Sequence, residues 1–179
     1  MKLAEAKQQF IQSWGVFASQ WGINRTMAQV HALLLVSGKP LSTDDIMSEL
    51  SISRGNTNMN VRELMNWDLV NKVILTGDRK EYFTAEKDIW KVATRIIQQR
   101  KKRELDPMLR ILSELDSIEG DKRNAEVKAF TDTIDNIRKF AGHAEKTLDV
   151  MIRAEENWFW NSFLKIFRLL LRKRSQTPL

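Results

Sequence analysis

Residues 42–84 read STDDIMSELSISRGNTNMNVRELMNWDLVNKVILTGDRKEYFT, and this stretch decides the expected fold. Ser42 and Asp45 fit a capping box, in which the hydroxyl accepts a hydrogen bond from the backbone N–H three residues on and the carboxylate accepts one in return. Ile46 and Leu50 then lie on one helical face. A first helix is therefore predicted from Ser42 to Leu50, followed by a tight turn.

A second helix is predicted after that turn, because Ser53 can cap it and its helical pattern continues to about Trp67. Its inward-facing residues, Val61, Leu64 and Met65, lie in its second half. Its first turns are polar instead and carry Arg54, Gly55, Asn56, Thr57, Asn58 and Asn60. Asn has a mediocre helix propensity, so this cluster favours a function over the alternative of a merely solvated helix start.

A β-hairpin is predicted next, because two apolar stretches, residues 69–75 and 82–84, flank a Gly-Asp turn. Its tip carries Arg79 and Lys80. The order of capped helix, turn, polar-faced helix and hairpin predicts a winged helix-turn-helix domain over residues 1–85. The expected fold class is mainly α with a small β-hairpin wing.

This order of elements favours binding to double-stranded DNA. A helix that enters the major groove with its N-terminal end presents its first residues to base edges, where Asn binds adenine and Arg binds guanine in a bidentate way. A Gly in the first turn lets the backbone approach a phosphate, and cations at a wing tip contact the DNA backbone or the minor groove. The predicted DNA contacts are Ser53, Arg54, Gly55, Asn56, Thr57, Asn58, Asn60, Arg62, Arg79 and Lys80. An ordinary surface hairpin is the alternative for the wing, and Lys39 and Lys72 are either peripheral phosphate contacts or solvated charges.

The formal net charge of +6 is unevenly distributed along the chain. Residues 1–85 hold nine Lys or Arg against eight Asp or Glu, whereas the remaining residues hold twenty against fifteen. Nonspecific affinity for DNA scales with the number of phosphates neutralised. A DNA-binding domain with a net charge of +1 must therefore depend on a few placed cations and on a second subunit, and its binding should weaken readily as salt rises.

At these residues the chain resembles the GbsR/MarR-type winged-helix transcriptional regulators. The resemblance is carried by residues 53–64 and 67–70, by Gly77, Asp78, Arg79, Lys80 and Tyr82, and it continues through residues 90–92 and the basic run at 100–103. One departure is Asp68, where the family commonly has Gly. A residue at that position can need a positive φ, which Asp tolerates better than most, so we expect a small stability cost and an unchanged fold.

The resemblance implies a dimeric transcriptional regulator. In the best known members of the family, the regulated genes concern compatible solutes such as glycine betaine, and choline is a sensed ligand. A choline-like cation binds over aromatic faces. Trp14, Trp21 and Trp90 could come together to form such a site where the first helix meets the helix after the wing. Because Trp at helical spacing is more often part of a core, no ligand-binding residue is assigned.

The composition of the chain fits one intracellular, mainly helical unit. The 179 residues contain no cysteine, which excludes disulfides, and the first residues do not resemble a signal peptide, so a cytoplasmic protein is expected. There is no Ser-His-Asp set, HExxH pattern or glycine-rich phosphate loop. His31 and His143 are expected to be structural or solvated, and neither an enzyme, a metal site nor a cofactor is predicted.

Two packing helices are predicted ahead of the DNA-binding elements. The first has an apolar stripe at helical spacing, formed by Leu3, Phe10, Trp14, Phe17 and Trp21. The second begins near Asn24 and ends at Gly38, before a proline that blocks its continuation. It should brace the helix that starts at Ser42.

Residues 86–174 are predicted to form a helical dimerisation region. Pro107 should kink or restart the first long helix, with Asp106 as its cap, and the basic run at 100–103 is interpreted as a solvated face in preference to a DNA contact. Residues 122–152 then show a heptad seam, whose partner the sequence leaves open as the same chain or a second subunit. The seam consists of Val127, Phe130, Ile134, Ile137, Ala141, Ala144, Leu148 and Met151. A homodimer is expected, because a two-fold DNA reader needs two recognition helices about 34 Å apart.

The segment 158–171 is apolar on most faces and is expected to dock in the dimer, and residues 175–179 are expected to be a frayed tail. The favoured function is a homodimeric DNA-binding regulator of the repressor kind, with a small-molecule effector as an option. Two other classes remain as alternatives: a winged-helix module that binds protein and not DNA, and a peripheral membrane protein that uses its C-terminal amphipathic helix.

Overall fold

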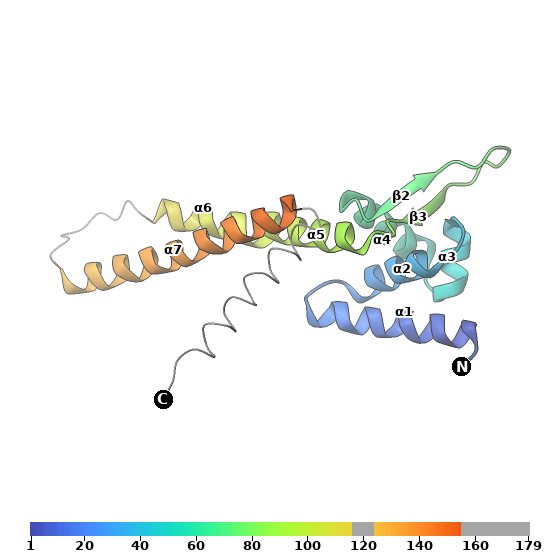
Figure 1. The fold of residues 1–179 in the computed structure, drawn as a ribbon, viewed down its shortest axis with the longest axis horizontal. Helices are drawn as coiled ribbons and strands as arrows, with labels where there is room; N and C mark the ends of the chain where they lie inside the picture. Colours follow the sequence, from blue (N-terminus) through green and yellow to red (C-terminus); the bar gives the residue numbers. More distant parts are fainter. Residues whose placement is uncertain (116–123, 155–179) are drawn as a thin grey trace, which may run out of the picture. The chain divides into compact units, whose positions relative to one another are not determined.

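The computed structural model describes residues 1–115 and 124–154. The predicted helix 158–171 and the tail 175–179 lie outside the described residues. The elements are α1 (Leu3–Gln20), α2 (Arg25–Val36), β1 (Leu41–Ser42), α3 (Thr43–Leu50), α4 (Arg54–Asn66), β2 (Val70–Val73), β3 (Tyr82–Ala85), α5 (Ile89–Arg100), the π-helix η1 (Lys101–Leu105), α6 (Asp106–Glu114) and α7 (Ala125–Arg153) (Figure 1). They divide into two compact units, Met1–Arg95 and a second that starts at Ile96.

The helix-turn-helix forms as predicted because its start signals are local. The Ser42 hydroxyl accepts a hydrogen bond from the Asp45 N–H at 3.2 Å, and the Asp45 carboxylate accepts one from the Ser42 N–H at 2.8 Å. The Ser53 hydroxyl accepts from the Asn56 N–H at 3.3 Å. The core beneath these helices consists of Val30, Leu34, Ile46, Val61, Leu64 and Leu69. The predicted fold class, mainly α with a winged helix-turn-helix, is confirmed.

The wing belongs to a three-stranded antiparallel sheet with the order β1-β3-β2, so the prediction of a two-stranded hairpin was incomplete. Phe83 lies at the centre of the sheet, paired with Leu41 of β1 and Lys72 of β2. A strand of two residues is too short to show the apolar alternation that identifies strands. The backbone pairing of Leu41 therefore appears only once α3 and β3 are packed together.

The apolar stripe predicted to pack α1 is not the face that the helix buries. Ile11, Gly15 and Ala18 are buried instead, and a Cβ on Gly15 would lie 2.7 Å from the Gln29 side chain of α2. Small residues let two helices approach closely, which the aromatic stripe would prevent. The rings of Phe10, Trp14, Phe17 and Trp21 form a ladder with centroids 5.4, 6.2 and 5.9 Å apart, and Phe17 and Trp21 are more than half exposed.

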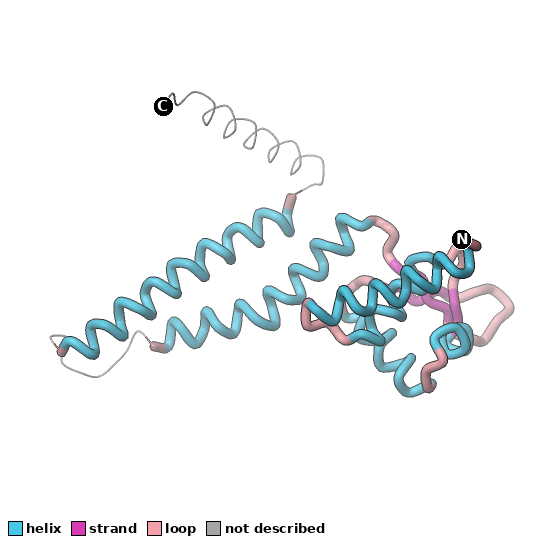
Figure 2. The backbone as a smooth tube through the Cα atoms, turned by 90° about the horizontal axis from the view of Figure 1, so that it is seen from below, coloured by secondary structure: helices cyan, strands magenta, loops and turns pink. Residues whose placement is uncertain are grey.

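In the second unit, η1 and α6 lie beside α7 (Figure 2). Ala141 of the predicted seam is buried, Phe130 and Ile137 are exposed, and the other seam residues are half-buried. The seam is thus partly covered by its own chain. Pro107 falls in the first turn of α6, and the helix reaches it through the wider turn of η1. The prediction of Asp106 as the cap was wrong, because Asp106 is the first residue of α6 and the preceding Leu105 is already helical.

The solvated basic run predicted at 100–103 needs a correction at Lys101. Its ammonium contacts Asp106 and Glu145 at 3.2 Å and Asp149 at 3.5 Å, and only 16% of its side chain is exposed. Two of its three partners, Glu145 and Asp149, come from α7, so the sequence of the run alone does not reveal the pairing. Among the helices that the structure describes, none is long and apolar enough to cross a bilayer.

Candidate nucleic-acid interface

The first turns of α4 present a polar face to solvent. Ser53, Arg54, Gly55 and Arg62 are exposed, and there is open space where a Cβ on Gly55 would lie. Asn56 and Asn58 are half-buried, and the Asn58 amide oxygen accepts a hydrogen bond from the Thr43 hydroxyl at 3.4 Å. Five of the residues predicted to contact DNA therefore share the N-terminal end of α4: Ser53, Arg54, Gly55, Asn56 and Asn58. Arg62 is exposed one turn further along the helix.

Two of the predicted contact residues, Thr57 and Asn60, face inward, with 0% and 3% of their surface exposed. They lie three and four residues from Val61 and Leu64, on the same buried face of α4. The packing of that face on the core therefore buries Thr57 and Asn60 although both are polar. The Thr57 hydroxyl donates to the Ser53 carbonyl at 3.1 Å, and the Asn60 amide donates to the Asn56 carbonyl at 2.8 Å. These hydrogen bonds satisfy the buried groups, and neither side chain is exposed to contact DNA in this structure.

An acidic residue that the sequence analysis missed lies among the exposed cations. Asp44, on the first turn of α3, contacts the Arg54 guanidinium at 2.5 Å and the Lys80 ammonium of the wing at 3.3 Å. The hydrogen bond from Lys80 and the charge of Arg54 lower the pKa of Asp44 below its ordinary value. The two cations predicted to bind phosphate are therefore paired with a carboxylate in the free protein.

The wing turn between β2 and β3 is ordered by Asp78. Its carboxylate accepts a hydrogen bond from the Tyr82 hydroxyl at 2.6 Å and another from the Lys80 N–H at 2.9 Å, while Gly77 supplies a φ of 86°. The Tyr82 hydrogen bond lowers the pKa of Asp78 and raises that of Tyr82. Arg79 at the tip is exposed. The wing turn thus presents one exposed guanidinium, that of Arg79, to solvent.

Lys72, whose role the sequence left open, pairs with Glu81 across the wing. Both residues flank the loop that joins β2 to β3, and the pair is partly exposed. Lys72 is therefore a brace between the two strands in the free protein. Lys39 is exposed beside Asp45, whose pKa is lowered chiefly by its hydrogen bonds with Ser42.

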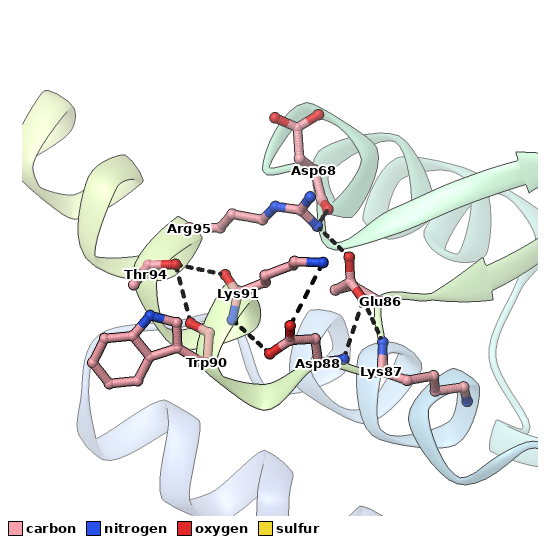
Figure 3. Close-up of polar contacts among 8 residues, drawn as sticks. All are labelled: Asp68, Glu86, Lys87, Asp88, Trp90, Lys91, Thr94 and Arg95. Atoms are coloured by element: carbon pink, nitrogen blue, oxygen red, sulfur yellow. Dashed lines mark hydrogen bonds and ion pairs between the residues drawn. The ribbon is translucent and has the colours of Figure 1, made fainter. Parts of the chain in front are cut away.

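The end of α4 is tied to the start of α5 by Arg95 (Figure 3). Its guanidinium donates to the Asp68 carbonyl at 2.5 Å and contacts the Glu86 carboxylate at 3.2 Å. Glu86 also accepts hydrogen bonds from the backbone N–H groups of Lys87 and Asp88. Asp68 has a φ of 57°, so the left-handed conformation anticipated for this departure from Gly is confirmed.

A second junction holds the end of α2. The Lys87 ammonium donates to three backbone carbonyls, those of Leu34 at 2.7 Å, Leu35 at 2.6 Å and Ser37 at 3.0 Å. A cation at a helix C-terminus satisfies carbonyls that have no helical partner. Beside it, burial and then the charge of Lys87 lower the pKa of His31 to about 4. The expected structural role of His31 fits its 2% exposure.

One cleft of the first unit lies between α1, the end of α2 and α3, with a volume of about 560 Å³. Lys7, Lys39 and Glu49 supply its charges, and apolar side chains such as Ile11 and Leu33 supply its walls. None of the described residues that line it is aromatic. Its chemistry therefore does not match the aromatic faces that bind a choline-like cation.

No family model matches the chain. A curated relative, the HTH-type transcriptional repressor GbsR of Bacillus subtilis (strain 168), is 25% identical over 103 residues, which cover 58% of this chain and 57% of the relative. The match thus spans little more than half of the length of that protein.

The crystal structure of a transcriptional regulator superposes with a TM-score of 0.60 at 17% identity, covering 82% of this chain and 95% of that one. The adhesin competence repressor AdcR of Streptococcus pyogenes aligns with a TM-score of only 0.34 at 19% identity, covering 83% of this chain and 99% of that one. The fold, together with the curated relative, confirms the resemblance of this chain to the GbsR/MarR-type winged-helix regulators.

Proposed function

We propose that this chain is a transcriptional regulator of the repressor kind that binds double-stranded DNA sequence-specifically as a homodimer. The observation that carries the proposal is the exposed polar end of α4, whose first residue, Arg54, shares the Asp44 carboxylate with Lys80 of the wing. Groups on a helix end can reach base edges in the major groove while a wing cation contacts the DNA backbone or the minor groove. The repressor kind is supported by the relative GbsR, which is a repressor by name.

The proposed contacts divide into two classes. Asn56 and Asn58 are suited to adenine, and Arg62 is suited to guanine or to a phosphate. Gly55, with open space above its Cα, lets the backbone approach a phosphate. The complete proposed set, without the buried Thr57 and Asn60, is Ser53, Arg54, Gly55, Asn56, Asn58, Arg62, Arg79 and Lys80.

The homodimer is proposed because large apolar side chains stay exposed in each unit by itself. In the second unit these are Met108, Ile111, Leu115, Phe130, Ile137, Phe140 and Val150. Exposed apolar surface on this scale favours a protein partner, and a second copy of the chain also supplies the second recognition helix that a two-fold operator requires. The predicted dimerisation set remains Val127, Phe130, Ile134, Ile137, Ala144, Leu148 and Met151, with Phe130 and Ile137 the most accessible of them.

Response to a small molecule is proposed from the family resemblance alone, which points to a choline-like cation. The cleft beside α3 carries two lysines, and we do not place such a cation there. The protein is proposed to act in the cytoplasm, as a binding protein rather than an enzyme.

Fluorescence anisotropy with labelled DNA from upstream of the chain's own gene tests the proposal. The wild type should bind at low salt, lose affinity steeply between 50 and 200 mM salt, and prefer this DNA over a scrambled duplex. Arg79→Ala and Asn58→Ala should weaken binding, whereas Lys139→Ala, on an exposed position of α7, should not. Absence of binding to any duplex at low salt would refute DNA recognition, and a monomeric mass by light scattering at micromolar concentration would refute the homodimer.

A further inference from the structure

Asp44 joins three elements of the proposed DNA-binding face. It lies on the first turn of α3, Arg54 is the first residue of α4, and Lys80 lies in the wing. One carboxylate oxygen is 2.5 Å from the Arg54 guanidinium, and the other is 3.3 Å from the Lys80 ammonium. We call these three residues the Asp44 clasp. Their side chains are 47%, 62% and 57% exposed, so a ligand can reach all of them from solvent.

The clasp resembles the contact that the same cations would make with DNA. A phosphodiester presents two anionic oxygens, and the Asp44 carboxylate offers one oxygen to each cation in the same manner. Arg54 and Lys80 are two of the few cations in the domain, whose residues 1–85 carry a net charge of only +1. A DNA phosphate and Asp44 therefore compete for the same two side chains.

The position of Asp44 also favours its negative charge independently of those cations. It occupies the first turn of α3, where unpaired backbone N–H groups and the helix dipole favour a negative charge. The adjacent capping box, formed by Ser42 and Asp45, holds that turn through its own hydrogen bonds. Exchange of Arg54 and Lys80 from Asp44 to a phosphate can thus occur while α3 stays folded.

We propose that Asp44 is a built-in competitor for phosphate, which limits the affinity of the domain for DNA of any sequence. This inference rests on the proposed function and deepens it, because it assigns to the same site a residue that limits the affinity for DNA. In nonspecific complexes, phosphate contacts supply nearly all of the binding free energy. A carboxylate that occupies two phosphate-binding cations therefore acts most visibly on nonspecific DNA.

Binding of the full-length protein to a random-sequence duplex measures this effect, with Kd determined at several salt concentrations. Asp44→Asn removes the charge and is expected to tighten binding at low salt by about threefold to tenfold, with a salt slope steeper by about 0.9 for each domain bound. Asp132→Asn is the matched control, because it changes the net charge equally at an exposed position of α7. Asp44→Glu retains the charge and should bind like the wild type.

The outcomes separate the inference from the proposed function. Tighter and more salt-dependent DNA binding by Asp44→Asn than by Asp132→Asn supports the proposal that Asp44 competes with phosphate. Equal binding by the two variants, or weaker binding by Asp44→Asn, overturns it while leaving DNA binding intact. If neither the wild type nor any variant binds DNA at low salt, the proposed function itself fails. Thermal melting verifies folding, and Asp44→Ala supplies a second charge-free variant should Asp44→Asn not fold.

Discussion

Acidification should destabilise the first unit through His31. This side chain of α2 is 2% exposed, and its Nε2 atom has no hydrogen-bond partner within the described part of the chain. Burial, reinforced by the charge of Lys87, lowers its pKa from 6.5 to about 4. The folded protein therefore holds a neutral imidazole at a pH where the unfolded chain already binds a proton.

The sign and size of the effect follow from proton linkage. Because the folded-state pKa of His31 lies below the unfolded one, its contribution to stability is present above pH 6.5 and is lost as the pH falls from 6.5 towards about 4. The whole window is worth about 3 kcal/mol, and the part between pH 7.5 and pH 5 is worth about 2 kcal/mol. Most carboxylates stay ionised above pH 5, so this upper part of the window reports mainly on histidine.

Urea unfolding, followed by circular dichroism at steps from pH 7.5 to pH 5, measures this loss. The wild type should lose about 2 kcal/mol over the range, whereas His31→Leu, which removes the titrating group and keeps an apolar side chain, should lose much less. His143→Gln, at an exposed position of α7, is the control and should follow the wild type. Parallel pH profiles for the wild type and His31→Leu would refute the assignment of the acid sensitivity to the buried imidazole.

Three further substitutions test the local geometry. Asp68→Gly should stabilise the protein by about 1 kcal/mol in urea unfolding, because Gly adopts the φ of 57° without steric cost while the carbonyl bonded to Arg95 remains; a loss of stability would contradict this. Lys87→Met should lower the free energy of unfolding by about 1 kcal/mol, because the last carbonyls of α2 lose their cation. NMR titration of this variant should show a higher pKa for His31, and an unchanged pKa would contradict the coupling between Lys87 and His31. Gly55→Ala should raise the melting temperature, since Ala favours a helix by about 0.5–1 kcal/mol and there is open space for its methyl group. The same substitution should weaken DNA binding measured by anisotropy, because the methyl group would stand where a phosphate approaches. Unchanged affinity would show that no phosphate approaches Gly55.

The elements of the DNA-binding domain were predictable because their determinants are local. The capping box of Ser42 and Asp45, the cap at Ser53 and the left-handed residue Asp68 each depend on backbone groups within a few positions. Such interactions form in the same way wherever the segment lies. Sequence patterns therefore predicted the starts of α2, α3 and α4, the position of the wing and the resemblance to the family.

The face that each helix buries was less predictable. Thr57 and Asn60 are polar, so composition placed them at the surface, yet α4 turns them inward, where hydrogen bonds to Ser53 and Asn56 satisfy them. In α1, the aromatic residues form the stronger apolar stripe, but the small residues pack because they permit a shorter distance to α2. The polarity of a residue determines what its burial costs. Which face of a helix is buried depends also on the shapes of the side chains that must pack together.

By itself, the sequence determined the order of capped helices, the turn, the wing and the positions of the exposed cations, since backbone propensities and side-chain caps act over short distances along the chain. Only the tertiary structure decided that β1 completes the sheet, that Lys87 closes the end of α2, and that Asp44 holds Arg54 and Lys80 together. These contacts join residues ten or more positions apart. No local pattern encodes them, because they arise when separate elements are packed on one core.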